Sequence, residues 1–340
     1  MPYNDSWYRV ADVRLGLLPN IEVHKQVYRG ETWYVLQHPG SAKYFRVRPE
    51  GYRFICALTP DRTVAEVWRE ALGRDPEHAP DQGEVVNLLV QLHHANLLFF
   101  RSQGDQEAIF DRFRQQRGRE RFGQLLALLY LKIPLWNPER FLNRTRGLLT
   151  PLFAPPMLLL WGAAMLMFGK LAVEHWEQLW VAGQGLLAPS NLPLLYACVF
   201  VLKLFHEMAH AIVCKRYGGQ VHSMGLMFIV FTPLPYIDAS ASWSMRNRWQ
   251  RAYVGAAGMI IELLFASGAM LVWLYTGPGI INSLAFNLIL AGSVSALLFN
   301  GNPLLRFDAY YILSDLAELP NLYQKSAAQW LYYGDRFLFG

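Results

Sequence analysis

The residues best suited to chemistry lie at 206–210, which read His-Glu-Met-Ala-His. His206 and His210 are four residues apart, so on a helix both imidazoles project from one face. Two such nitrogens can hold one Zn²⁺ ion, and Glu207 beside the metal can take a proton from water. The pattern predicts a hydrolytic zinc site. The alternative, a pair of interfacial histidines on an ordinary membrane helix, is disfavoured because ionisable groups are costly in lipid.

A catalytic zinc site needs a third protein ligand and an open coordination position. The first candidate is Asp308, which follows the last apolar segment of the chain. Pro303 breaks that segment, and non-helical backbone at membrane depth must line a protein cavity. The alternative role for Asp308 is to cap a helix or to pair with Arg306. Cys214, four residues after His210, is the rival third ligand.

The apolar residues gather in the second half of the chain. Hydrophobic residues make up 53% of the sequence and charged residues 17%, yet residues 1–146 have a soluble composition. The uncharged segments that follow are long enough to cross a bilayer as helices. A Thr-Gly-Pro-Gly turn at 276–279 divides the last of them. We therefore expect four membrane helices, at about 148–169, 190–215, 252–275 and 280–301.

Basic residues predict the orientation in the membrane. Between Asp111 and Arg146, nine Lys and Arg residues accompany three acidic ones. Under the positive-inside rule this block stays in the cytoplasm, against anionic headgroups. Nucleic-acid binding is the rival interpretation, and it is disfavoured because the block flanks a membrane span. The sequence thus predicts a multi-pass protein of the cytoplasmic (inner) membrane with its N-terminal domain in the cytoplasm and no nucleic-acid partner.

The first hundred residues predict a small α+β domain. Short strands are expected at 23–28, 32–37, 44–47 and 97–100. Thr63 and Asp81 are expected to cap two helices that follow a shorter one at 51–58. Three strands followed by three helices suggest a winged-helix-like module, a fold that binds DNA or peptides. Its helices show no basic recognition face, which disfavours DNA.

Part of this module resembles PqqD-like domains. The resemblance is carried by the run from Tyr28 to Leu36, by Tyr44-Phe45-Arg46 and by Gln91-Leu92-His93. PqqD-like domains are peptide carriers that serve ribosomally made, modified peptides. The resemblance covers about residues 14–101 and implies that a peptide adds as a strand to the exposed sheet edge. The alternative is a domain that only packs on the membrane part.

The second half of the chain resembles the site-2 protease family of intramembrane zinc metalloproteases. The residues that carry this are the HExxH pattern at 206–210, Tyr217-Gly218-Gly219, residues 231–240 and Asn-Pro-x4-Asp at 302–308. The similarity runs from about residue 147 to 322. It is strongest to bacterial peptide zinc metalloproteases, which join a PqqD-like N-terminus to this core.

That resemblance implies roles for individual residues. His206, His210 and Asp308 would be the zinc ligands, and Glu207 would be the general base. The family usually has Asp-Gly where this chain has Asp308-Ala309, and the added methyl group could crowd the loop. Asn302 is expected to donate a hydrogen bond to the oxyanion or to the substrate backbone.

Two further features have open roles. Glu262 is alone among apolar residues, and it could anchor the site or a proton path. It could equally be neutral, or be paired with a polar group such as Asn287 or Asn300. Residues 221–232 are expected to form either a re-entrant strand that presents an edge to substrate or a buried apolar connector.

The sequence therefore predicts a multi-domain protein: a small α+β domain, then an all-α polytopic membrane domain with a re-entrant segment. The expected segments are a peptide-binding domain at 1–105, a basic juxtamembrane linker at 106–146, a metalloprotease domain at 147–322 and a C-terminal segment at 323–340. The expected function is a zinc endopeptidase whose peptide or membrane-protein substrate is recruited by the N-terminal domain. The alternative is a non-proteolytic membrane adapter that carries ribosomally made peptides to a maturation, export or efflux partner. Glu207 favours the enzyme, because an adapter needs no base.

Overall fold

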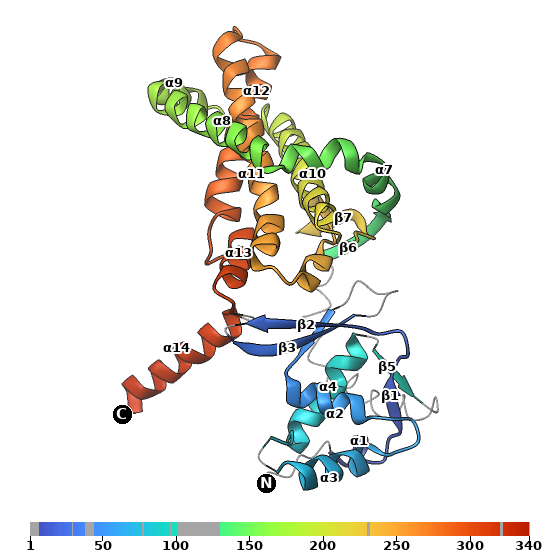
Figure 1. Ribbon diagram of the computed structural model, residues 1–340. Helices are drawn as coiled ribbons and strands as arrows, with labels where there is room; N and C mark the ends of the chain where they lie inside the picture. Colours follow the sequence, from blue (N-terminus) through green and yellow to red (C-terminus); the bar gives the residue numbers. More distant parts are fainter. Residues whose placement is uncertain are drawn as a thin grey trace. The chain divides into compact units, whose positions relative to one another are not determined.

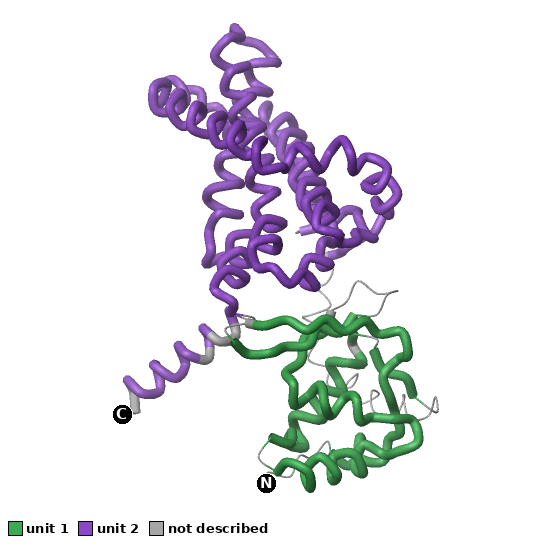
Figure 2. Tube along the Cα trace, in the orientation of Figure 1, with its two compact units in different colours: residues 1–130 green, residues 131–340 purple. Residues whose placement is uncertain are grey.

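The chain divides into two compact units, residues 1–130 and 131–340 (Figure 2). The structure is a computed structural model, with its elements labelled in Figure 1. It describes residues 7–28, 30–37, 44–76, 78–95, 97–100, 130–229, 232–319 and 322–339. Residues 101–129 lie outside the described residues, and these include 106–129 of the basic linker expected at 106–146.

The described residues of unit 1 form two small antiparallel sheets. The three-stranded sheet has the order β2 (Glu22–Tyr28), β3 (Glu31–Gln37), β4 (Tyr44–Val47). The second sheet pairs β1 (Leu15–Leu17) with β5 (Leu98–Phe100). All four expected strands are confirmed to within two residues. β1 and the one-turn helix α1 (Trp7–Val10) were not expected, because such short elements show no hydrophobic periodicity.

Three helices complete the core of unit 1: α2 (Pro49–Ala57), α3 (Val64–Arg74) and α4 (Gln82–His94). Thr63 and Asp81 cap α3 and α4 as expected, each in a capping box with the glutamate three residues later. The buried faces of α2, α3 and α4 join the strands in two apolar clusters that include Leu36, Phe54 and Leu92. The α+β class is confirmed, and the winged-helix arrangement stays a prediction.

Unit 2 is mainly helical. Among its described residues, four helices are long and apolar enough to cross a membrane: α8 (Pro155–Glu174), α10 (Leu192–Arg216), α11 (Arg248–Tyr275) and α12 (Ile280–Val294), whose π-helical continuation ends at Asn300. α10, α11 and α12 pack against one another, and α8 packs on α11 (Figure 1). The other α-helices described in unit 2 are α7 (Glu139–Leu149), α9 (Trp176–Gly183), α13 (Asp308–Leu316) and α14 (Leu322–Phe339). The four expected spans are therefore found as helices.

The first span begins later than expected, at Pro155 instead of residue 148. Proline lacks an amide hydrogen and fits only the first turn of a helix. The prolines at 151, 155 and 156 therefore prevent one continuous helix, and each stands at the start of a new helical segment. The preceding residues instead form a separate helix, α7 (Glu139–Leu149), and a single 3-10 turn, Thr150–Phe153.

The side chain of Glu139 connects α7 to the end of α10 through hydrogen bonds. Its carboxylate accepts hydrogen bonds from Lys215 and from the Val221 amide. Burial raises the pKa of Glu139, but Lys215, the Val221 amide and Asn143 outweigh it and hold the pKa below its ordinary value. Glu139 is therefore a carboxylate at neutral pH.

Unit 2 also contains a sheet, so the expectation of an all-α membrane domain is wrong. β6 (Tyr130–Trp136), β7 (Met224–Ile229) and β8 (Thr232–Ile237) form it in that order. An added Cβ at Gly225 would lie 2.0 Å from the Ile133 carbonyl oxygen, so only glycine permits this approach of β6. The sheet was not foreseen because its first strand lies about ninety residues before its second. Within residues 221–232, Met224–Ile229 form a strand, and a re-entrant course for this segment stays a prediction.

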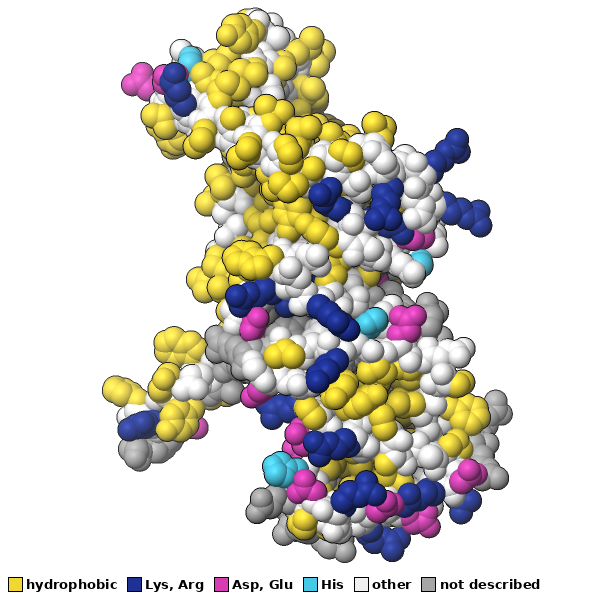
Figure 3. All heavy atoms as spheres, in the orientation of Figure 1, with side chains coloured by type: hydrophobic (Ala, Val, Ile, Leu, Met, Phe, Trp, Pro, Cys, Tyr) yellow, Lys and Arg dark blue, Asp and Glu magenta, His cyan; other side chains and the backbone are white. Residues whose placement is uncertain are grey.

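The surface of unit 2 separates apolar from basic residues. Hydrophobic side chains cover most of the visible face over α8 and α9, and Lys and Arg gather beside α7 (Figure 3). On α8, Leu159, Leu166 and Val173 are each more than three-quarters exposed. Exposed apolar side chains of this density fit contact with lipid.

Candidate metal centre

Three side chains from two helices converge at one buried point. His206 and His210 lie one turn apart on α10, and their Nε2 atoms are 3.0 Å apart. Asp308 is the first residue of α13. Its Oδ2 lies 3.1 Å from His206 Nε2, and its Oδ1 lies 3.5 Å from His210 Nε2. Their ligand atoms all lie within 4.8 Å of one another, so the three predicted ligands form one group.

This donor set fits a zinc ion. Two imidazole nitrogens and one carboxylate are the protein ligands of many catalytic zinc sites. Asp308 Oδ2 is buried and makes no hydrogen bond, a costly arrangement that a bound cation would relieve. Burial raises the pKa of Asp308, but the neighbouring His210 and His206 outweigh it and hold the pKa well below its usual range. Asp308 is thus ionised, as a metal ligand must be.

The second nitrogen of each histidine faces an oxygen. His210 Nδ1 donates to the Val254 carbonyl oxygen at 2.6 Å. His206 Nδ1 lies 3.0 Å from Glu262 Oε1, an ion-pair distance without hydrogen-bond alignment. A proton held at Nδ1 leaves the lone pair of Nε2 directed at the metal position. Both oxygens come from α11, which therefore determines how the two rings are oriented.

A glycine on α11 makes room for the first ligand. An added Cβ at Gly258 would lie 2.3 Å from His206 Cε1 and 2.5 Å from Nε2, so the ring rests directly on the helix backbone. Neither Gly258 nor the contact of Glu262 with His206 was foreseen from the sequence. The signal that could have found them is a glycine four residues before a lone acid in an apolar span, since such residues share a helix face.

Polar contacts hold α13, and with it Asp308, against α11. Arg251 Nε donates to Asp315 Oδ1 at 2.7 Å, and Arg251 Nη1 donates to the Met245 carbonyl oxygen at 2.8 Å. A Cβ at Gly255 would come within 3.0 Å of Ile312, so the two helices are in close contact there. The third ligand therefore occupies a fixed position although it lies far along the chain from the first two.

Glu207 is connected to the sheet. Its Oε2 accepts a hydrogen bond from the Ile237 amide at 3.0 Å, where β8 ends. β8 packs along α10, and Tyr196 of that helix donates to the Pro233 carbonyl oxygen at 2.6 Å. The predicted base thus lies between the metal ligands and the final residue of a strand.

The other residues singled out from the sequence do not belong to the group of three metal ligands. Cys214 is buried against Gly219 and does not join the metal-binding group found among the described residues. Asn302 Oδ1 accepts from the Leu304 amide at 2.9 Å, and its role toward substrate stays a prediction. Asn300 is buried and donates to Glu262 Oε2 at 3.2 Å, which confirms one of the expected partners of Glu262. Asn287, the other, pairs with Asn191.

Residues 194–328 match the family model of peptidase family M50. The matched segment runs from α10 into α14 and contains the whole ligand group. Searches of curated proteins and of solved structures found no match. Family M50 comprises zinc metalloproteases of the site-2 protease type. Together with the four apolar helices, the match supports a multi-pass, membrane-embedded metalloprotease. The PqqD-like character of unit 1 stays a prediction.

Proposed function

We propose that this protein is a zinc endopeptidase of the cytoplasmic membrane, with unit 1 in the cytoplasm, that cleaves a peptide or a membrane-protein substrate. The observation that carries the proposal is the convergence of His206, His210 and Asp308, with Glu207 on the same turn as the first ligand. A buried set of two histidines and an acid is needed to hold a metal. The added glutamate is needed only if a proton must be moved.

Each residue of the site has a separate proposed role in hydrolysis. When bound, Zn²⁺ supplies Lewis-acid chemistry at a site with an open position. Glu207 Oε1 takes the proton of the attacking water and later gives it to the leaving amine, while the Ile237 amide holds Oε2. Val254 and Glu262 keep both imidazoles oriented throughout, so the ligands need not reorganise.

We propose that the substrate segment containing the cleaved bond lies beside β8. This strand has one strand neighbour, β7, in the sheet that the structure describes, and its last residue contacts Glu207. Pro233 and Pro235 have no amide hydrogen, and the Pro233 carbonyl oxygen already accepts from Tyr196. A substrate at this edge would therefore find the Pro235 carbonyl oxygen as its main-chain partner, and a full added strand is not proposed. The exposed apolar residues Leu131, Ile133 and Leu135 of β6 fit a sheet that enters the membrane, as proposed for a re-entrant segment.

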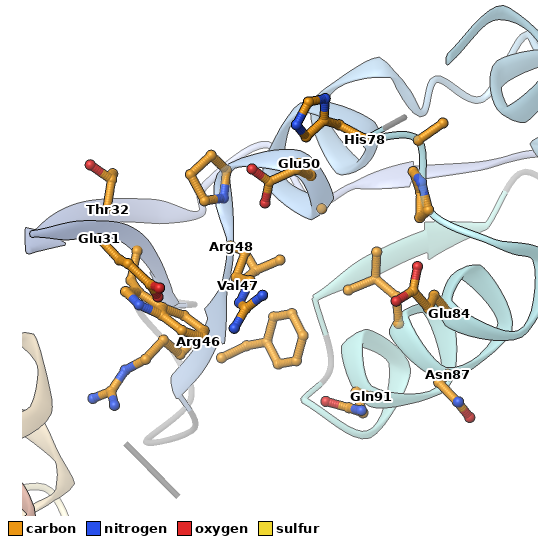
Figure 4. A pocket seen from close by; sticks show the side chains of 17 residues that line it. Glu31, Thr32, Arg46, Val47, Arg48, Glu50, His78, Glu84, Asn87 and Gln91 are labelled. Atoms are coloured by element: carbon orange, nitrogen blue, oxygen red, sulfur yellow. The ribbon is translucent and has the colours of Figure 1, made fainter. Parts of the chain in front are cut away.

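Unit 1 is proposed to recruit the substrate through a groove beside β4. The groove encloses about 850 Å³ between this edge strand and α4. Arg46, Val47 and Arg48 line one side, and Glu84, Asn87 and Gln91 of α4 are among the residues that line the other (Figure 4). An extended peptide could pair with the strand while its side chains meet groups of both charges on the walls.

The decisive experiment compares the wild-type protein with Glu207→Gln. Glutamine cannot accept the proton of water, so the variant should bind zinc normally and lose cleavage by a factor of about 10² to 10⁴. New N-termini of membrane proteins and peptides would be mapped by mass spectrometry in cells that express either form. If both forms yield the same set of N-termini while both bind zinc, the adapter alternative is favoured over the protease.

Recruitment is tested separately by filling the groove in the full-length protein. Asn87→Trp should raise the KM for a substrate found by the mass-spectrometry experiment and leave its kcat nearly unchanged. The matched control is Gly73→Trp on α3, where an added Cβ meets nothing within 4 Å. Equal KM values for the two variants would count against recruitment through this groove.

A further inference from the structure

A buried polar cluster lies behind His206. Its centre is Glu262, a carboxylate with no exposed surface in the middle of α11. Oε1 of Glu262 accepts from Lys203 Nζ at 2.7 Å and from Ser295 Oγ at 3.1 Å, and it lies 3.0 Å from His206 Nδ1. Oε2 accepts from Asn300 Nδ2 at 3.2 Å. We call these residues, Lys203, Glu262, Ser295 and Asn300, the Glu262 cluster.

The helical turn that contributes Ser295 and Asn300 is wider than an α-helical turn, and this geometry brings both residues to Glu262. Residues 295–300 form a π-helical turn, in which backbone hydrogen bonds join residues five apart. Ser295 and Asn300 are five apart, so this turn brings both side chains to the same carboxylate. Gly292, one turn earlier, lets α12 approach, since an added Cβ would lie 2.8 Å from the Glu262 carbonyl oxygen.

Stability alone does not explain such a cluster. Replacing a buried ion pair by apolar residues of similar size is often neutral or stabilising, so an apolar span has no need of one here. A carboxylate that holds the second nitrogen of a metal-binding histidine, however, fixes the ring and increases the basicity of the ligand. The cluster places the two groups for this contact, because Glu262 Oε1 lies 3.0 Å from Nδ1 of His206, although the two atoms are not aligned as a hydrogen bond.

We propose that Glu262 is a positioning residue of the metal centre, and that Lys203, Ser295 and Asn300 hold its carboxylate against His206. Glu262 keeps the proton of His206 on Nδ1 and the ring in the orientation that presents Nε2 to the metal. Lys203 balances the charge of Glu262, so its carboxylate can remain buried behind His206. The inference rests on the proposed zinc site and not on the identity of the substrate.

The test measures metal binding by the full-length protein in detergent. Zinc affinity is obtained by competition with a chromophoric chelator, and the ligand field is read from the visible absorption of the cobalt(II)-substituted protein. Glu262→Gln should weaken zinc binding about 10- to 100-fold and alter the cobalt bands, because the ring of His206 is no longer held by a carboxylate. Because Glu262→Gln leaves Lys203 without its counter-charge, the double variant Lys203→Met/Glu262→Met, which removes both charges, is measured beside it.

A matched ion pair serves as the control. Lys170 and Glu174 form an exposed pair on α8 with a separation of 3.6 Å, so Lys170→Met/Glu174→Met should leave affinity and spectrum unchanged. A folded Lys203→Met/Glu262→Met protein with wild-type zinc affinity and wild-type cobalt bands would overturn the positioning role. Failure of the proposed function would appear differently: the wild type would bind zinc with the predicted dependence on Glu262 and yet cleave nothing.

Discussion

Replacing Gly258 by alanine should disable the metal centre by displacing one ligand. The added Cβ would lie 2.3 Å from His206 Cε1 and 2.6 Å from Nδ1. Carbon atoms in contact prefer about 3.5 Å or more, so the ring must move by about 1 Å or α11 must shift. Metal–ligand distances tolerate only about 0.2 Å, and losing the support of a single ligand already weakens metal binding about 10- to 100-fold. We therefore expect zinc affinity to fall at least about 100-fold.

The same substitution elsewhere on α11 provides the control. At Gly268 an added Cβ meets nothing within 4 Å, so Gly268→Ala should keep wild-type zinc affinity and stabilise the helix by about 0.5–1 kcal/mol. Gly258→Ala should instead destabilise the protein by about 1–3 kcal/mol through overpacking. Zinc content by elemental analysis, zinc affinity by chelator competition and thermal unfolding would be measured for both variants. Wild-type zinc affinity in Gly258→Ala would refute the packing argument.

Three further predictions concern the ligand set, the topology and acid stability. Asp308→Ala should lose most bound zinc and Cys214→Ser should not; elemental analysis with the opposite result would change the third ligand. A cysteine at Gln184 should react with an impermeant reagent from outside the cell and one at Arg144 should not; the reverse labelling would refute the proposed orientation. The pKa of Glu139 is lowered in the folded protein, so its contribution to stability is present above the unfolded pKa and is lost as the pH falls through the folded value. Glu139→Gln should therefore lower the unfolding temperature at pH 7 and make no difference near pH 2; a constant difference across that range would contradict the linkage.

The metal ligands could be predicted from the sequence because their signals are local. Two histidines at helical spacing must share a face, and a break after the last span places Asp308 near the membrane end of the bundle. Of the contacts of Glu262, the one with Asn300 was among those expected, and the other three could not be predicted. They come from Lys203 and His206 on α10 and from Ser295 in the π-helical turn. No spacing along one helix indicates which residue of another helix it will meet.

The elements of unit 1 were predictable for a similar reason. Thr63 and Asp81 each precede a glutamate by three residues, so the caps are encoded within four positions. The sheet of unit 2 depends on β6, which pairs with a strand far away in the sequence. Its alternation of Leu131, Ile133 and Leu135 puts apolar groups on an exposed face, the opposite of the pattern expected for a strand in water.

The hydrogen bond from the Ile237 amide to Glu207 has a kinetic consequence. One oxygen of Glu207, the proposed base, is bound to the strand beside which the substrate is proposed to lie. Substrate binding and proton transfer would then depend on the same few backbone atoms. A substitution that loosens β8 should then change kcat and KM together, even where the altered side chain contacts neither substrate nor metal. At β8, therefore, affinity and rate cannot be tuned independently, whereas the groove beside β4 is proposed to affect KM alone. Changes of substrate preference that act through β8 would therefore also alter turnover.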